Sequence, residues 1–200
     1  INRYIYTVNS DYVISNNNKL KVDNILMDDY TLNLSFSLEL DNVDYTKIED
    51  LIFSNILITD DYNNILYANN EQSFNNYCDK NNLNYSFMDF TDNYINSGVN
   101  WYIQSIDNNI IKVIYNYTPS GLSKYPNSKS LNINLKDFKI AENSEEISSN
   151  WFFTIDLPDY FYNRTNISYK LAESNNPNFK IKEFNVYKSC SKLLMEMPKP

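Results

Sequence analysis

The stretch TLNLSFSLEL, residues 31–40, alternates without a break between apolar and polar side chains. Leucine or phenylalanine occupies every second position from Leu32 to Leu40, and small polar or acidic residues fill the positions between. Successive side chains of a β-strand point to opposite faces, so this alternation predicts a strand with one face on a core and one in water. The same pattern, repeated elsewhere, decides the fold class.

Less regular versions of the pattern recur along the chain and predict about ten strands in all. Residues 19–27 are the expected partner of 31–40, with Asp28 and Asp29 in the turn, and residues 45–53 are expected to hold one helical turn. A hairpin is predicted at 55–68, and single strands at 100–106, 109–118, 131–140, 151–157, 165–171 and 179–188. So many short strands with few helical periods are typical of an all-β, mostly antiparallel, two-layer β-sandwich.

Two of these strands lose their alternation at a single residue, Asp137 in one and Glu183 in the other. A slip by one position indicates a β-bulge. The turns are expected at asparagines, because the chain has only two glycines and Asn tolerates a positive φ better than any residue except Gly.

In NWFFTIDLPDYFYNR, residues 150–164, Trp151, Phe153, Ile155 and Leu157 fall on one face of a predicted strand. We expect these four side chains to be buried and Asp156, on the other face, to be solvated. Pro158 has no N–H to donate and is expected to end the strand.

Residues 71–100 break the rhythm and are expected to form a long irregular or partly helical excursion from the sheets. The aromatic residues in or beside it are a candidate ligand or partner surface: Tyr77, Tyr85, Phe87, Phe90, Tyr94 and Trp101. Tyrosine and tryptophan are common binding anchors. The alternative, which we favour, is that these rings form a small second core under the excursion.

Composition excludes several classes of function. The net charge of −8 argues against a nucleic-acid partner, whose expected footprint is a basic patch. Histidine is absent, which removes His-based triads and His metal sites. Two cysteines, Cys78 and Cys190, could form a disulfide, although two buried free thiols are the favoured interpretation. No run is long enough for a membrane span, and we expect no cofactor and no metal.

Catalytic motifs are equally scarce. The paired carboxylates Asp28/Asp29, Asp60/Asp61 and Glu145/Glu146 lie beside turn signals, and we expect all three pairs to be solvated loop residues. The turn DDYNN, residues 60–64, offers oxygen ligands to calcium but lacks the EF-hand spacing. The sequence therefore favours a protein that is not an enzyme.

Two stretches carry a resemblance to a known family: SKYPNSKSLNINLKDFKI, residues 123–140, and residues 150–164 followed by ISYKL. They resemble an extracytoplasmic β-rich domain of unknown function found in clostridial and bacillar membrane proteins, many of them labelled anti-sigma factors. The shared pattern includes Asn150, Trp151, Asp156, Pro158 and the FYNR corner that ends at Arg164. Residues 20–60 fit the family's opening strands more weakly.

The resemblance implies a single domain over residues 1–200, on the extracytoplasmic side of a membrane, anchored by a helix outside this stretch. It implies a sensor or interaction domain of a membrane-anchored regulator, with an extracellular ligand or envelope protein as partner. A sigma factor would bind only a cytoplasmic part that is absent here, and a second β module would follow residue 200. No direct membrane contact is expected within the stretch.

Two other functions stay open. One is a cell-surface binding module, adhesin-like or glycan-binding, and the other is a hydrolase that uses carboxylates alone. A last expectation concerns Arg164, one of only two arginines in the chain. Because a guanidinium offers a planar fork of donors, we expect Arg164 to hold the corner after Pro158 by bonding a carboxylate such as Asp159 or a backbone carbonyl.

Overall fold

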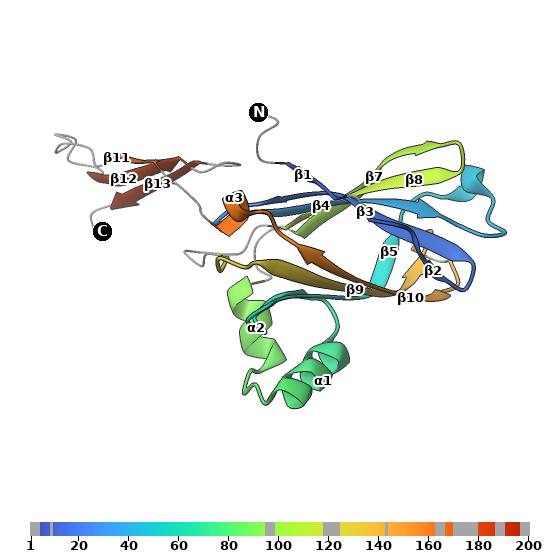
Figure 1. Ribbon diagram of the computed structural model, residues 1–200, viewed down its shortest axis with the longest axis horizontal. Coiled ribbons are helices and arrows are strands. Elements are labelled where there is room, and N and C mark those ends of the chain that lie inside the picture. The colour runs from blue at the N-terminus through green and yellow to red at the C-terminus, as the bar shows by residue number, and fades with distance from the viewer. Residues whose placement is uncertain are drawn as a thin grey trace.

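The computed structural model describes residues 5–8, 10–94, 99–117, 125–142, 144–162, 167–169, 180–186 and 191–196. Two antiparallel sheets pack face to face, as Figure 1 shows, so the predicted all-β sandwich is confirmed. The larger one, sheet A, has six strands in the order β1-β3-β4-β8-β7, with β2 also paired to β3. Its strands are β1 (Tyr6–Thr7), β2 (Val13–Ser15), β3 (Asn18–Met27), β4 (Leu32–Glu39), β7 (Val99–Asp107) and β8 (Ile110–Tyr117).

The alternation in residues 31–40 gives β4 its place at the centre of sheet A, between β3 and β8. Its apolar side chains are buried: Leu32, Leu34 and Leu38 are fully covered and Phe36 is 3% exposed. The predicted pairing with residues 19–27 is confirmed, since Met27 lies opposite Leu32 and Lys19 opposite Glu39.

The second layer, sheet B, has four strands in the order β10-β9-β5-β6. They are β5 (Ile52–Asp60), β6 (Ile65–Ala68), β9 (Ser130–Lys139) and β10 (Ile147–Asp156). The predicted hairpin at 55–68 and the helical turn before it, η2 (Tyr45–Lys47), are both present. On β10, Trp151 is fully buried and Asp156 is exposed, as expected.

The bulge predicted at Asp137 is confirmed. The register of β9 and β10 shifts between Ile147 and Asn150, and Asp137 has a φ of 45°. Its carboxylate accepts a hydrogen bond from the N–H of Ser149 at 3.0 Å. Asparagine supplies the other described non-glycine residues with positive φ: Asn16, Asn17, Asn42, Asn63, Asn82, Asn108 and Asn109. Asparagine therefore takes the place of glycine in the turns of this chain.

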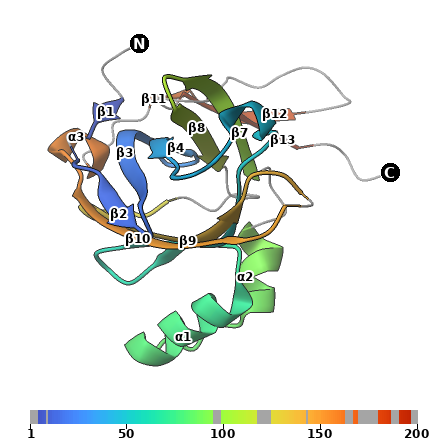
Figure 2. The same cartoon turned by 90° about the vertical axis from the view of Figure 1, so that its right-hand side faces the viewer.

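The excursion after β6 is more regular than the sequence indicates. It contains two helices, α1 (Glu71–Asn81) and α2 (Phe87–Tyr94), on the outer side of sheet B (Figures 1 and 2). The Asn70 side chain caps α1 by accepting from the N–H of Ser73 at 3.0 Å, and Asn82 ends the helix in the left-handed conformation. Local capping, which leaves no trace in the alternation of apolar and polar residues, therefore sets the bounds of α1.

A third sheet follows the short helix α3 (Asp159–Tyr162). Sheet C contains β11 (Ile167–Tyr169), β12 (Lys180–Val186) and β13 (Ser191–Glu196), in that order. Among the described strands it pairs only within itself, and in Figure 1 it lies beside the sandwich, beyond α3. The register of β12 shifts between Ile181 and Glu183, so a bulge is present, and its extra residue is Lys182, next to the predicted Glu183.

The expectation that all paired carboxylates are solvated is wrong for Asp28, Asp29 and Asp60, which are 2%, 6% and 1% exposed. The reason is a distant segment that covers both turns. The N–H of Tyr125 donates to the carbonyl of Asp29 at 2.8 Å, and Ser128 Oγ donates to Asp60 Oδ2 at 2.9 Å. The three remaining members, Asp61, Glu145 and Glu146, are exposed as expected.

The Asp60 carboxylate is a structural hydrogen-bond acceptor. Oδ1 accepts from the N–H groups of Tyr62 and Asn64 at 2.9 and 2.8 Å, and Oδ2 accepts from the Asn64 side chain and from Ser128. These donors occupy the oxygens that a cation would need. Within the described part of the chain, no group of three or more His, Cys, Asp or Glu residues is placed to hold a metal ion.

Candidate functional site

A groove of about 670 Å³ runs over the outer face of sheet A, the side away from sheet B, α1 and α2. Its floor follows from the polar half of the alternation in β4. Asn33 and Ser35 point outward along this central strand, and these short side chains leave a valley between the strands on either side. Ser37, on the same face, is fully buried and bonds Lys112 and Asp23. The sequence places Asn33 and Ser35 on a solvated face, and the structure makes them the bottom of a groove.

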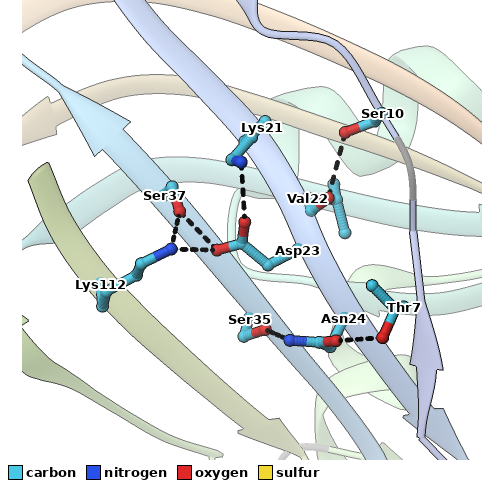
Figure 3. Close-up of polar contacts among 9 residues, drawn as sticks. All are labelled: Thr7, Ser10, Lys21, Val22, Asp23, Asn24, Ser35, Ser37 and Lys112. Carbon is cyan, nitrogen blue, oxygen red and sulfur yellow. Dashed lines mark hydrogen bonds and ion pairs between the residues drawn. The ribbon is translucent and has the colours of Figure 1, made fainter.

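A β-bulge on β3 places Asp23 in this groove. The register passes from Val22 opposite Phe36 directly to Asn24 opposite Ser35, so Asp23 has no partner residue on β4. A bulge re-aims the side chain of its extra residue. In Figure 3 the Asp23 carboxylate extends along the face of the sheet toward β4 and β8.

A second bulge lies on β7, on the other side of β8. Ile103 is opposite Val113 and Ser105 is opposite Lys112, which leaves Gln104 as the extra residue. Gln104 lines the same groove as Asp23. Because Phe36 pairs with both Val22 and Val113, the two bulges flank a single row of paired residues. Two strands therefore interrupt their pairing at the same level of one groove.

Asp23 is the centre of a charged network (Figure 3). Lys112 Nζ donates to Asp23 Oδ2 at 3.1 Å and also to Ser37 Oγ, and Ser37 Oγ donates to Asp23 Oδ2 at 2.5 Å. Lys21 Nζ lies 3.4 Å from Asp23 Oδ1. Two ammonium groups thus share one carboxylate, so the described charged residues that line the groove carry a net charge of +1. The chain as a whole carries −8.

The N-terminal segment forms one wall of the groove. The N–H of Val8 donates to the carbonyl of Asp23 at 2.8 Å. Asn24 then links this wall to the floor, because its Oδ1 accepts from Thr7 Oγ1 and its Nδ2 donates to Ser35 Oγ, both at 3.1 Å. The bulge carbonyl and one amide side chain therefore hold the wall in place.

A second polar cluster adjoins the groove. Lys19 Nζ lies 3.0 Å from Glu39 Oε2, and this hydrogen bond is the main reason that the pKa of Glu39 is lowered. Burial, together with a hydrogen bond to Glu39, raises the pKa of Tyr12 to about 12. Lys21 Nζ sits 5.1 Å from the centre of the Tyr12 ring. Both lysines of β3 are thus fixed by neighbours on the same face.

The aromatic residues predicted as a ligand surface do not converge on one site. Tyr77 and Phe87 pack against a small apolar cluster of Ile65, Ala68, Phe74, Cys78 and Phe90, which is the second core that we favoured. Trp101 packs instead between the sheets, where its ring stacks on Phe53 at 5.3 Å. The side chain of Tyr94 lies outside the described residues.

Tyr85 is the member of the predicted set that stays exposed, at 57%. It borders a smaller pocket of about 250 Å³ together with Asn84, Asp89 and Phe90. This pocket lies beside α2, on the opposite side of the sandwich from the groove.

Two other predictions concern residues near the chain's last third. Asp159 is exposed at the start of α3, and Arg164 lies outside the described residues, so the corner contact stays a prediction. Cys78 is a buried free thiol whose pKa is raised by burial and by Asp79, and Cys190 also lies outside the described residues.

The groove residues Lys21, Asp23, Gln104 and Lys112 escaped prediction from the sequence, although a signal for two of them exists. In KVDNIL the apolar phase slips at Asp23, and in WYIQSI it slips at Gln104. These are the same slips that identify the bulges at Asp137 and Glu183. Lysine, in contrast, gives no such signal, because a lysine on the outer face of a strand is usually solvated.

Comparisons with known proteins bear on the fold. No protein-family model matches the chain, and no curated protein matches it. A solved structure is similar: the conserved domain protein from Bacillus anthracis, with a TM-score of 0.51 and 13% sequence identity. The match covers 93% of this chain and 53% of that chain, so this chain spans about half the length of its neighbour. At this identity the likeness shows the fold alone. None of the described helices is long and apolar enough to cross a membrane.

Proposed function

We propose that the protein is a non-enzymatic binding domain that holds its ligand in the groove over β4. The observation that carries the proposal is the pair of bulges, at Asp23 and Gln104, that direct polar side chains into one groove from two strands. Bulges interrupt the strand pairing and are over-represented beside functional sites. Their coincidence in one groove indicates a built site rather than an ordinary solvated face.

The chemistry of the groove supports binding over catalysis. Carboxylate-based hydrolysis uses two carboxyl groups that face each other across the substrate. Asp23 supplies the one carboxylate among the described lining residues, and it is paired with Lys21 and Lys112. Its Oδ2 already accepts hydrogen bonds from Lys112 and Ser37, and its Oδ1 lies 3.4 Å from Lys21 Nζ, so both oxygens are engaged by the protein itself.

The resemblance described above supplies a context for this proposal: the ligand-binding, extracytoplasmic part of a membrane-anchored regulator of the anti-sigma type. The alternative context is a cell-surface binding module. In both contexts the domain binds a ligand outside the cell. The identity of the ligand would therefore distinguish a regulator from a cell-surface binding module.

The test uses the labelled protein and a soluble digest of bacterial cell wall, followed through backbone and side-chain amide NMR signals. We expect shifts at the side-chain amides of Asn33 and Gln104 and at the backbone of Asp23. The variant Ser35→Phe fills the valley and should abolish these shifts. Because it also removes the hydrogen bond from Asn24 to Ser35, a circular dichroism spectrum like that of the wild type is the check that the sandwich stays folded. Shifts confined to α1 and α2 would overturn the groove as the binding site.

A further inference from the structure

The structure assigns the groove over β4 to an acidic saccharide, a sugar chain that carries carboxylate groups. This inference rests on the proposed function and names the ligand class for the same site. It follows from three properties of the groove: its charge, the kind of polar group that lines it, and its position on the face of the sheet.

The charge favours an anion. Lys21 and Lys112 both contact Asp23, at 3.4 and 3.1 Å, and one carboxylate neutralises only one of them. Their side chains remain 32% and 42% exposed, so each ammonium can still reach a ligand. Each ammonium also has three donor positions. A ligand carboxylate would supply the missing negative charge. The groove is thus locally attractive to an anion, although the chain as a whole, with a net charge of −8, repels anions.

The other polar groups match sugar hydroxyls. Asn33, Ser35 and Gln104 line the groove beside the charged pair. Amide and hydroxyl side chains carry both donors and acceptors, as sugar hydroxyls do. Apolar atoms of Val8, Leu26 and Ile114 lie among them, and these can cover the C–H face of a pyranose ring. The groove therefore offers polar groups for the hydroxyls of a sugar and apolar atoms for its C–H face.

The position of the groove argues against an acidic peptide. Peptides bound by β-proteins commonly add as a strand to a free sheet edge, where backbone N–H and C=O groups are available. Here the groove lies over β4, whose backbone is paired with β3 on one side and β8 on the other. A ligand in this groove must therefore be recognised by side chains, and the side chains present are suited to hydroxyl and carboxylate groups.

The test compares three ligands of equal length by isothermal titration calorimetry at low ionic strength. They are a galacturonic acid tetramer, its neutral methyl ester, and a tetraglutamate peptide. We expect the acid sugar to bind, the ester to bind at least about tenfold more weakly because charged hydrogen bonds are lost, and the peptide to bind more weakly than the acid sugar. Added salt should weaken the acid sugar, since the groove is open to solvent.

Matched variants locate the effect. Lys112→Gln should weaken binding of the acid sugar by roughly tenfold. Lys47→Gln removes the same charge from another ion-paired lysine, 3.4 Å from Asp44 and outside the groove, and should leave the affinity unchanged. Equal weakening by both variants would reduce the effect to net charge and overturn the site.

The remaining outcomes are equally decisive. Equal binding of acid and ester would overturn the role of the ammonium groups, and tighter binding of tetraglutamate would overturn the saccharide class. If neither acid binds, the ligand class is wrong. The cell-wall titration then distinguishes the two proposals: continued shifts at Gln104 and Asn33 would leave the binding function standing with a different ligand.

Discussion

Lys112 on β8 donates a hydrogen bond of 3.1 Å to Asp23 on β3, across the intervening strand β4 and over a separation of 89 residues. The contact depends on two local features. The bulge at Asp23 brings the carboxylate onto the outer face, and the short side chain of Ser37 lets Lys112 extend over β4. This one pair therefore joins β8 to β3 across the floor of the groove.

The first prediction measures this pair. Combining Lys112→Met with Asp23→Asn in a double-mutant cycle should give a coupling of about 0.5–1 kcal/mol in the free energy of unfolding, because the pair is only partly shielded from solvent. Urea denaturation at low and high salt measures it, and the coupling should shrink as salt rises. A coupling near zero at low salt would mean that the pair positions side chains without stabilising the fold.

The second prediction concerns β10. Trp151 is fully buried and contacts Phe53 and Phe138, with ring centroids 6.1 and 5.6 Å away. Trp151→Ala should therefore lower the free energy of unfolding by about 3–5 kcal/mol. Asp156→Asn, on the exposed face of the same strand, should change it by less than about 0.5 kcal/mol. Chemical denaturation compares the two, and the reverse order would invert the assigned faces of β10.

The third prediction concerns Asp60. Its buried carboxylate accepts four hydrogen bonds, two of them from the backbone of its own turn. Asp60→Ala leaves these donors without a partner and should cost about 2–4 kcal/mol in the free energy of unfolding. Glu145→Ala, an exposed carboxylate, is the control and should stay within about 0.5 kcal/mol of the wild type. Equal effects of the two variants would contradict the role of Asp60 as a structural hydrogen-bond acceptor.

The fourth prediction is a pH dependence that arises from Tyr12. Burial and the hydrogen bond to Glu39 raise the pKa of Tyr12 to about 12, above the value of about 10 expected in the unfolded chain. The unfolded state therefore loses its proton first, and stability falls as the pH rises from about 10 to 12. Over this pH range, the midpoint of thermal unfolding should fall more for the wild type than for Tyr12→Phe. A parallel loss in both proteins would assign the effect to other tyrosines.

Several features of the fold were predictable because they depend on local geometry. The side chains of a strand change face at every residue, so the alternation in 31–40 and in 151–157 identifies the buried faces directly. The phase slips at Asp137 and Glu183 mark bulges for the same reason. Asparagine in the turns follows from its tolerance of positive φ.

The helices α1 and α2 were only half predicted, because their apolar faces are short. Phe74 and Cys78 are the buried residues of α1, one turn apart, and they pack against a small cluster rather than the main core. So narrow a stripe is hard to distinguish from an irregular loop.

By itself, then, the sequence determined the fold class, the inner face of the central strands and the positions of two bulges, since each of these is written in the spacing of neighbouring residues. Only the tertiary structure decided which polar side chains meet on the outer face and which of the paired carboxylates are buried. Lys112 meets Asp23 over 89 residues, and Ser128 meets Asp60 over 68. Contacts at such separations depend on which strands become neighbours and in which register, and no local period in the sequence carries that information.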